Sequence, residues 1–199
     1  MPESAPTLTT AKPAFWNVPN SITIGRMVLS IVVFVLIAWE QYFLAAAVFG
    51  VAAITDALDG YLARLLNQAT PIGRQLDPLC DKVIVAGTYI YLLTIEGTGV
   101  RPWMVTTIVI RELLIQGLRS HLEGQGQAFG AKLAGKIKTA VQCLSISAVL
   151  VCLWLKPGPI WLIGRDVLTW LAVLLTIYSG LVYVISAAPS LRGRDRGSA

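Results

Sequence analysis

Charge is scarce in this sequence. Only 14% of the 199 residues are Asp, Glu, Lys or Arg, 55% are hydrophobic, and the mean hydropathy is +0.68. Soluble domains average about a quarter charged residues, so this composition argues against one and indicates a polytopic membrane protein with a single membrane domain. The net charge of +5 then fits anionic lipid headgroups and cytoplasmic loops better than nucleic acid.

Cysteine and histidine are also rare. Cys80, Cys143 and Cys152 stand in apolar runs without the spacing of metal ligands, which predicts buried thiols rather than a disulfide framework. The single histidine, His121, is expected near a helix end without a catalytic role. The first 16 residues lack the basic, apolar and small-residue order of a signal peptide. The stretch GQGQAFG lacks the strand and spacing of a dinucleotide-binding loop.

Six stretches are long and apolar enough for membrane helices, each of which needs about 20 residues. They cover residues 22–39, 42–66, 78–95, 103–122, 137–155 and 167–187. Asp77 is expected to cap the third of them, just ahead of Pro78. We therefore predict an all-α fold, a bundle of six transmembrane helices over residues 20–189. Residues 1–19 would form an N-terminal segment at the cytoplasmic surface and residues 190–199 a basic tail.

Lysine and arginine set the expected orientation. With both termini in the cytoplasm, three cations lie outside: Arg101, Lys156 and Arg165. Twelve then lie at or near the inner side: Lys12, Arg26, Arg64, Arg74, Lys82, Arg119, Lys132, Lys136, Lys138, Arg192, Arg194 and Arg196. The positive-inside rule favours this arrangement.

Four aspartates gather in one short part of this apolar chain. Asp56 and Asp59 share a helical face with two small residues, Gly60 and Ala63, while Asp77 and Asp81 share a face of the next predicted helix. Two helix ends joined by a tight connection could bring all four carboxylates together. Clustered carboxylates need a cation to stay ionised, and Mg²⁺ or Mn²⁺ suits such oxygen ligands. Two ions about 4 Å apart would suit a phosphoryl displacement.

Simpler interpretations exist for each residue. Asp77 could be only a helix cap, and Arg64 only a cytoplasmic anchor rather than a diphosphate ligand at the rim of the site. Asp59 and Asp81 could be structural ion-pair partners of Lys82 or Arg26. The combined pattern of four aspartates, two small residues and an arginine favours a functional site.

The same residues carry a family resemblance. Asp56, Asp59, Gly60, Ala63, Arg64, Gly73, Asp77 and Asp81 fill the pattern D-x-x-D-G-x-x-A-R-x8-G-x3-D-x3-D without departure. This pattern resembles the signature of the CDP-alcohol phosphotransferases, which transfer a phosphatidyl or similar group from a CDP-linked donor to an alcohol and release CMP. The six-span plan extends the resemblance over most of the chain.

The resemblance implies roles for these residues. Asp56, Asp59, Asp77 and Asp81 would ligate two Mg²⁺ or Mn²⁺ ions, and Asp81 would also act as general base. The CDP-linked donor would be bound by Asp56, Asp59, Gly60, Ala63, Arg64 and Gly73. The family also tends toward homodimers. Together with the predicted orientation, the resemblance also places the chain in a bacterial plasma membrane, with its active site at the cytoplasmic face.

A second polar group concerns the acceptor. Arg111 and Glu112 fall within the fourth predicted span, where charges are costly, and Arg119 follows about two turns later. Lys136 shares a face with Thr139 at the start of the fifth span, whereas Lys138 points nearly the opposite way and could merely extend to the interface. Arg119 could instead pair with Glu123.

Several cations around a cytoplasmic cavity favour a phosphorylated acceptor, bound by Arg111, Arg119, Lys136 and Lys138. The segments VPNSITIGRMVL, RELLIQGLR and GKIKT also resemble the bacterial branch that makes phosphatidylglycerophosphate from CDP-diacylglycerol and sn-glycerol 3-phosphate. Inositol phosphate, serine and phosphatidylglycerol remain alternative acceptors. A divalent-cation transporter is the alternative from another class, but the aspartates cluster at one membrane face without a matching polar path in the outer half.

Overall fold

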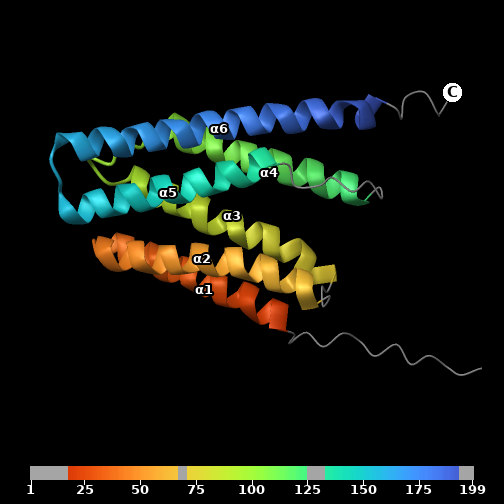
Figure 1. The fold of residues 1–199 in the computed structure, drawn as a ribbon, viewed down its shortest axis with the longest axis horizontal. Coiled ribbons are helices and arrows are strands. Elements are labelled where there is room, and N and C mark those ends of the chain that lie inside the picture. Colours follow the sequence, from red (N-terminus) through yellow and green to blue (C-terminus); the bar gives the residue numbers. More distant parts are fainter. Residues whose placement is uncertain (1–17, 67–70, 125–132, 193–199) are drawn as a thin grey trace, which may run out of the picture.

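Six α-helices and no strand make up the part of the chain that the computed structural model describes, residues 18–66, 71–124 and 133–192 (Figure 1). The helices are α1 (Val18–Ala38), α2 (Tyr42–Leu66), α3 (Pro71–Leu93), α4 (Pro102–Gly124), α5 (Leu133–Leu155) and α6 (Pro159–Arg192). Side chains are described except at 18–23, 56–66, 71–81, 121, 123, 133–134 and 188–192. The prediction of an all-α fold is confirmed.

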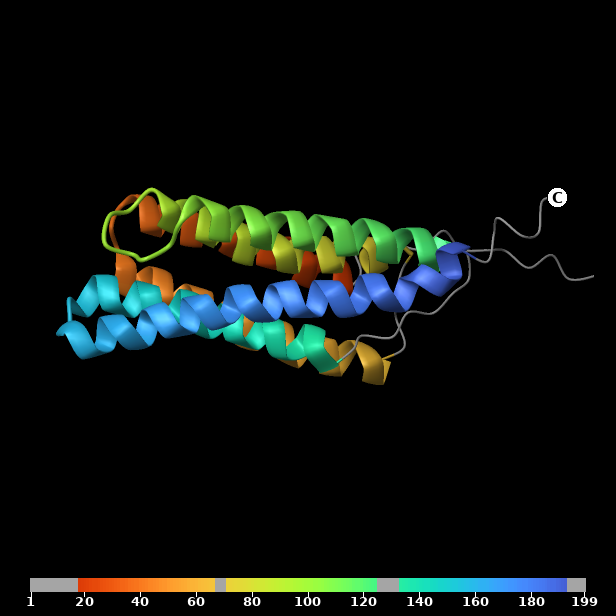
Figure 2. The same cartoon turned by 90° about the horizontal axis from the view of Figure 1, so that it is seen from above.

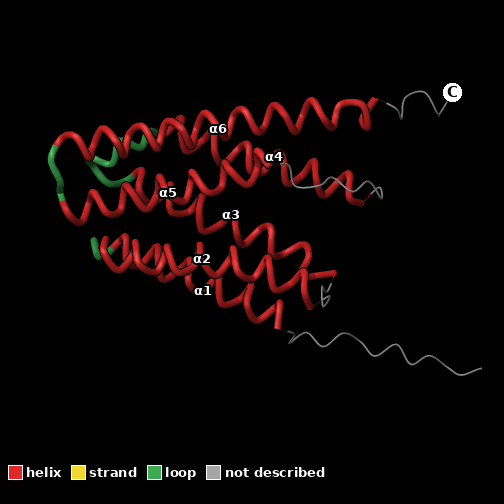
Figure 3. The backbone as a smooth tube through the Cα atoms, in the orientation of Figure 1, coloured by secondary structure: helices red, strands yellow, loops and turns green. Residues whose placement is uncertain are grey.

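The helices run up and down along one common direction (Figures 1 and 2). The connections after α1, α3 and α5 lie at one end of the bundle, and the first turn of α1 and the last turn of α6 lie at the other (Figure 3). Helix α1 packs on α2 and α3. Helix α5 packs on α2 and α6, and helix α4 packs on α3 and α6. This order brings the end of α2 and the start of α3 to the same end of the bundle as the first turn of α1 and the last turn of α6.

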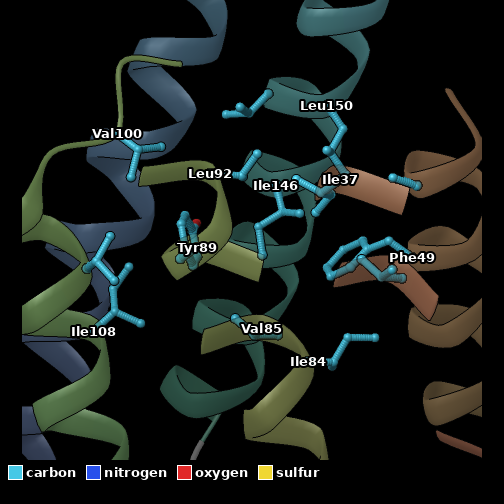
Figure 4. Packing of buried hydrophobic residues seen from close by; sticks show 14 of the residues in the cluster. Ile37, Phe49, Ile84, Val85, Tyr89, Leu92, Val100, Ile108, Ile146 and Leu150 are labelled. Atoms are coloured by element: carbon cyan, nitrogen blue, oxygen red, sulfur yellow. The ribbon is translucent and has the colours of Figure 1, made fainter. Parts of the chain in front are cut away.

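The core takes side chains from all six described helices, including Val173 of α6 (Figure 4). Ile37 of α1, Phe49 of α2, Leu92 of α3, Ile108 of α4 and Ile146 of α5 are all essentially buried. Because lipid tails are as apolar as these side chains, close packing rather than removal from water would hold the helices together in a membrane. The core therefore joins α1 and α2 to the remaining helices.

Large apolar side chains also cover much of the outside of the bundle. Ile31, Ile54, Leu114 and Ile185 are each about 60–70% exposed. Within the described residues, two helical segments are long and apolar enough to cross a membrane, Gly135–Leu155 and Pro159–Ala187. These features fit an association with a membrane. The number of spans and the side on which the termini lie stay predictions.

Helices α3 and α6 begin seven and eight residues earlier than the hydrophobic pattern predicted, and α1 and α5 each begin four residues earlier. Helix α3 starts at Pro71 rather than Pro78, so the prediction that Asp77 caps it is wrong, and Asp77 lies inside the helix. Proline is favoured in the first turn, where its missing N–H costs nothing, and Pro71 takes that position. Helix α6 starts at Pro159 rather than near Val167 for the same reason. Arg165 therefore lies within α6 and not in a loop.

The connection between α3 and α4 is fixed against α6. It contains Gly97 (φ 77°) and Gly99 (φ 74°), whose left-handed conformations favour glycine. The buried Arg165 donates from Nη1 to the Gly97 carbonyl at 2.5 Å and from Nη2 to Asp166 Oδ1 at 2.7 Å. This contact holds the end of the bundle that lies away from the aspartates.

Candidate functional site

The four signature aspartates lie at one end of the bundle, on two consecutive helices. Asp56 and Asp59 belong to the last part of α2, and Asp77 and Asp81 to the first part of α3. Both segments are helical throughout, which confirms the predicted spacing: each pair shares a helix face. Only residues 67–70 separate the two helices. The backbone is therefore compatible with four carboxylates facing one another.

The remaining signature residues follow the same helices. Gly60, Ala63 and Arg64 belong to α2, and Gly73 belongs to α3. The side chains of all the signature residues lie outside the described part, so their contacts stay predictions. In its chemistry the donor set fits a divalent ion, because carboxylate oxygens on two adjoining helices are the ligands that Mg²⁺ and Mn²⁺ prefer.

A buried ionic cluster lies between α4, α5 and α6. Lys138 of α5 donates from Nζ to Glu112 Oε1 of α4, and Arg111 donates from Nη1 to the same oxygen at 3.3 Å. Lys138 is 3% exposed and Glu112 6%. We call Arg111, Glu112 and Lys138 the α4–α5 cluster. Two cations share one carboxylate, so the cluster keeps an excess of positive charge in an interior position.

Residues of α6 hold Arg111 in place. Its Nη2 donates to Ser179 Oγ at 3.0 Å, and its guanidinium carbon lies 5.8 Å from the centre of the Tyr183 ring. Gly180 leaves the room for its aliphatic part, since a Cβ there would lie 3.1 Å from Arg111 Cγ. Among the described residues, the buried Nε of Arg111 has no hydrogen-bond partner. Arg111 is thus fixed in position from the side of α6.

A further contact ties α4 to the helix that carries two of the aspartates. Lys82 of α3 donates from Nζ to Gln116 Oε1 of α4. Lys82 directly follows Asp81 in the sequence, and Gln116 lies one turn after Glu112. The face of α4 that carries Glu112 and Gln116 therefore holds one lysine from α5 and one from α3.

The lysines of α5 lie differently from the prediction. Lys136 and Thr139 do share a face, as predicted, but both are exposed. Lys138 lies on the other face, yet the idea that it extends away from the site is wrong, because it is buried against Glu112. The sequence spacing separated the two faces correctly. It could not tell which of them faces α4.

Arg119 is half-buried further along α4. It borders a shallow groove between α4 and α6, together with Ile115, Leu118, Leu122, Tyr183 and Ala187. Because Tyr183 also contacts Arg111, the two arginines flank the same residue of α6. The structure thus brings Arg111 and Lys138 together, leaves Arg119 beside them, and leaves Lys136 on the exposed face. The side chain of Glu123, its predicted alternative partner, lies outside the described part.

The contribution of α6 to this region was not predicted from the sequence. Thr169, Thr176, Ser179 and Tyr183 are all buried and recur at spacings of seven, three and four residues, which places them on one helix face. Ser145 and Thr169 lie within hydrogen-bond distance at 3.0 Å, and Gln142 donates to Thr176 at 3.0 Å. The polar stripe along an apolar helix was a usable signal for this interface.

Comparison with known proteins adds a family. Residues 16–178 match the model of the family described as CDP-alcohol phosphatidyltransferase. The chain is 36% identical over 187 residues to the CDP-diacylglycerol–glycerol-3-phosphate 3-phosphatidyltransferase of Bacillus subtilis (strain 168), which covers 84% of this chain and 93% of that protein. It is 34% identical to the protein of the same name from Escherichia coli (strain K12), with 88% and 97% covered.

The match covers nearly the whole of both relatives, and residues 16–178, which match the family model, include all the signature residues from Asp56 to Asp81. This chain belongs to the CDP-alcohol phosphatidyltransferase family and is a phosphatidyltransferase enzyme.

Proposed function

We propose that this enzyme transfers the phosphatidyl group of CDP-diacylglycerol to sn-glycerol 3-phosphate, forming phosphatidylglycerophosphate and CMP. The observation that carries the proposal is the match, over most of the chain, to relatives named for this reaction. The buried α4–α5 cluster supports a phosphorylated acceptor, because a serine acceptor would not require several cations. Membership of the family argues against the divalent-cation transporter that the sequence left as an alternative.

The four aspartates would hold the divalent ions. Asp56, Asp59, Asp77 and Asp81 supply the carboxylates for two Mg²⁺ or Mn²⁺ ions, which when bound stabilise the charge of the diphosphate and of the leaving CMP. Gly60, Ala63, Arg64 and Gly73 shape the pocket of the CDP group. The small residues let the donor approach the backbone, and the arginine fork suits a phosphate.

Asp81 takes the proton of the acceptor hydroxyl in this mechanism. The hydroxyl oxygen forms a bond to the phosphorus of the phosphatidyl group, and the bond from that phosphorus to the oxygen of the CMP phosphate breaks. CMP leaves with the bond electrons. A carboxylate positioned within hydrogen-bond reach of a hydroxyl is an ordinary general base. The remaining contribution is orientation of donor and acceptor.

The acceptor phosphate would bind Arg111 and Lys138, with Arg119 and Lys136 at a greater distance from the cluster. Arg111 provides a planar fork and Lys138 a point charge, and both are already partly removed from water. Lys82, which follows the proposed base on α3, donates a hydrogen bond to α4. This contact supports a short distance between the acceptor-binding residues and Asp81.

An acceptor panel tests the reaction. Purified protein with CDP-diacylglycerol and Mg²⁺ would receive glycerol 3-phosphate, inositol phosphate, serine or phosphatidylglycerol, and the lipid product would be identified by mass spectrometry. We expect phosphatidylglycerophosphate from the first acceptor alone. Product from another acceptor and none from glycerol 3-phosphate would refute the proposal while leaving the family assignment intact.

We also propose six membrane spans with both termini in the cytoplasm of a bacterium, and a homodimer as in related enzymes. The up-and-down order of the helices and the excess of lysine and arginine toward one end support the topology. Labelling of single cysteines introduced at Glu40 and at Lys156, in a chain without its native cysteines, should occur from the outside of intact cells. Labelling only after lysis would show that the chain has the opposite orientation.

A further inference from the structure

Glu112 is the only carboxylate that the described residues bring to Arg111 or Lys138. It is 6% exposed and lies near the middle of α4, where an unpaired charge would be costly. Its Oε1 accepts from both cations. Removing one partner of a buried pair normally costs more than the pair contributes, so the three charges depend on one another.

The pairing of Arg111 with Glu112 is geometrically unusual. Neighbouring residues on a helix point about 100° apart and do not ordinarily face each other. Here both side chains turn toward the same point, and Arg111 is held from the other side by Ser179. A contact that only joined helices would require Lys138 and Glu112 alone. The additional contact between Arg111 and Glu112 indicates that Glu112 also fixes the position of the Arg111 guanidinium.

Donors remain after these contacts are counted. Lys138 has three N–H donors, and among the described residues one of them goes to Glu112. Arg111 has five, of which one goes to Glu112 and one to Ser179, while its Nε has no described partner. Both cations are therefore oriented by shared contacts and retain capacity for a phosphate with several acceptor oxygens.

The same face of α4 reaches the helix of the aspartates. Gln116, one turn after Glu112, accepts from Lys82, the neighbour of Asp81. Glu112 and Gln116 thus fix α5 and α3 to one face of α4 at adjacent turns. A shift of Glu112 would change the position of the two cations relative to the helix that carries the proposed base.

We propose that Glu112 is a positioning residue of the acceptor site, whose carboxylate holds Arg111 and Lys138 in the arrangement that binds the acceptor phosphate. This inference rests on the proposed function, since it assumes that glycerol 3-phosphate is the acceptor. Glu112 itself does not bind the phosphate, which its charge would repel. Its effect therefore acts through the two cations and should fall on the acceptor rather than on CDP-diacylglycerol.

The test compares Glu112→Ala with Glu112→Gln in purified enzyme. Glutamine keeps an oxygen that can accept from both cations, so these hydrogen bonds remain charge-assisted by their donors, but the attraction between opposite charges is lost. We expect the KM for glycerol 3-phosphate to rise about tenfold or more in Glu112→Ala and clearly less in Glu112→Gln, with the KM for CDP-diacylglycerol within about twofold in both. Equal changes in the two KM values would overturn the proposal.

A double-mutant cycle covers the case in which Glu112→Ala does not fold. Lys138→Met removes one of the two cations at similar length. If Glu112 acts through the cations, the effect of Glu112→Gln on the KM for glycerol 3-phosphate should shrink in the Lys138→Met background. An unchanged effect in that background would contradict a role through Lys138 and overturn the proposal.

Ser145→Ala is the matched control. It removes a buried contact between α5 and α6, Ser145 with Thr169, outside the α4–α5 cluster. We expect it to lower the midpoint of thermal unfolding without changing either KM value. An equal shift of the acceptor KM in this control would show a general effect of loosened packing and overturn the proposal. Failure of the wild-type enzyme to use glycerol 3-phosphate at all would instead refute the proposed function and, with it, this inference.

Discussion

Lys138 of α5 donates a hydrogen bond to Glu112 of α4 across the interior of the bundle, although 26 residues separate the two in the chain. Arg111 adds a second bond to the same carboxylate oxygen at 3.3 Å. Such a group of buried charges is expensive in an apolar bundle and is typical of a functional position. It gives the enzyme a cationic site on helices other than those that carry the four aspartates.

The first prediction concerns the metal ligands. Asp56→Asn, Asp59→Asn and Asp77→Asn should each reduce turnover nearly to background, because an amide cannot neutralise a divalent ion as a carboxylate does. CMP release should also stop in excess EDTA and return when Mg²⁺ or Mn²⁺ is added. The unfolding midpoint without metal is the control for folding. Full activity in EDTA would rule out the metal-dependent mechanism.

The second prediction concerns the general base. Asp81→Asn should still bind CDP-diacylglycerol but lose transfer by on the order of 10²-fold or more, as expected for a positioned base. Binding can be followed by the rise in unfolding temperature with CDP-diacylglycerol, and transfer by CMP release. Restoration of turnover at high metal concentration would assign Asp81 to metal binding alone, and near-normal turnover would move the base elsewhere.

The third prediction ranks the cations. Arg111→Ala should raise the KM for glycerol 3-phosphate far more than the KM for CDP-diacylglycerol, since Arg111 lies in the buried cluster. Lys138→Ala should have a similar selective effect. Lys136→Ala should have the smallest effect of the three because Lys136 is exposed on the opposite face. Steady-state kinetics in both substrates measures this, and a larger effect at Lys136 than at Lys138 would show that the exposed face binds the acceptor.

The fourth prediction uses the space that Gly180 leaves for Arg111. In Gly180→Ala the new Cβ would lie 3.1 Å from Arg111 Cγ, so the arginine must move by a few tenths of an ångström. The KM for glycerol 3-phosphate should rise roughly threefold, because small displacements of binding groups are costly to catalysis. Gly164→Ala is the control on the same helix, where a Cβ would meet nothing within 4 Å. Identical kinetics in the two variants would mean that Arg111 accommodates the methyl group without loss.

The hydrophobic pattern predicted the fold class and most helix positions. The bounds of α2 agree with the expected 42–66, because polar residues interrupt the apolar run at both of its ends: Glu40 and Gln41 precede it, and Asn67 and Gln68 follow it. The start of α3 was missed because its first turns are polar, and a search for apolar runs cannot see a helix that extends beyond the apolar part. Pro71 was the better start signal than Pro78.

The aspartates could be recognised as a candidate site from spacing alone because each pair repeats along a single helix, and their role as metal ligands stays a prediction. The α4–α5 cluster could be predicted only in part, since Arg111 and Lys138 come from different helices. The sequence of each helix does not determine how it is rotated about its axis relative to the other. The orientation of Lys138 was predicted wrongly for this reason, and the contacts of Arg111 with Ser179, Gly180 and Tyr183 were not predicted. Contacts between helices depend on packing, which local periodicity does not determine.

The dependence of CMP release on glycerol 3-phosphate tests the central proposal most directly. Purified enzyme would be given CDP-diacylglycerol labelled in its cytidine, with Mg²⁺, and the labelled CMP counted with and without glycerol 3-phosphate. The Asp59→Asn variant supplies the background. We predict release well above background only when glycerol 3-phosphate is present, with phosphatidylglycerophosphate formed in equal amount. Release that is independent of glycerol 3-phosphate, or no release with it, would contradict the proposed reaction.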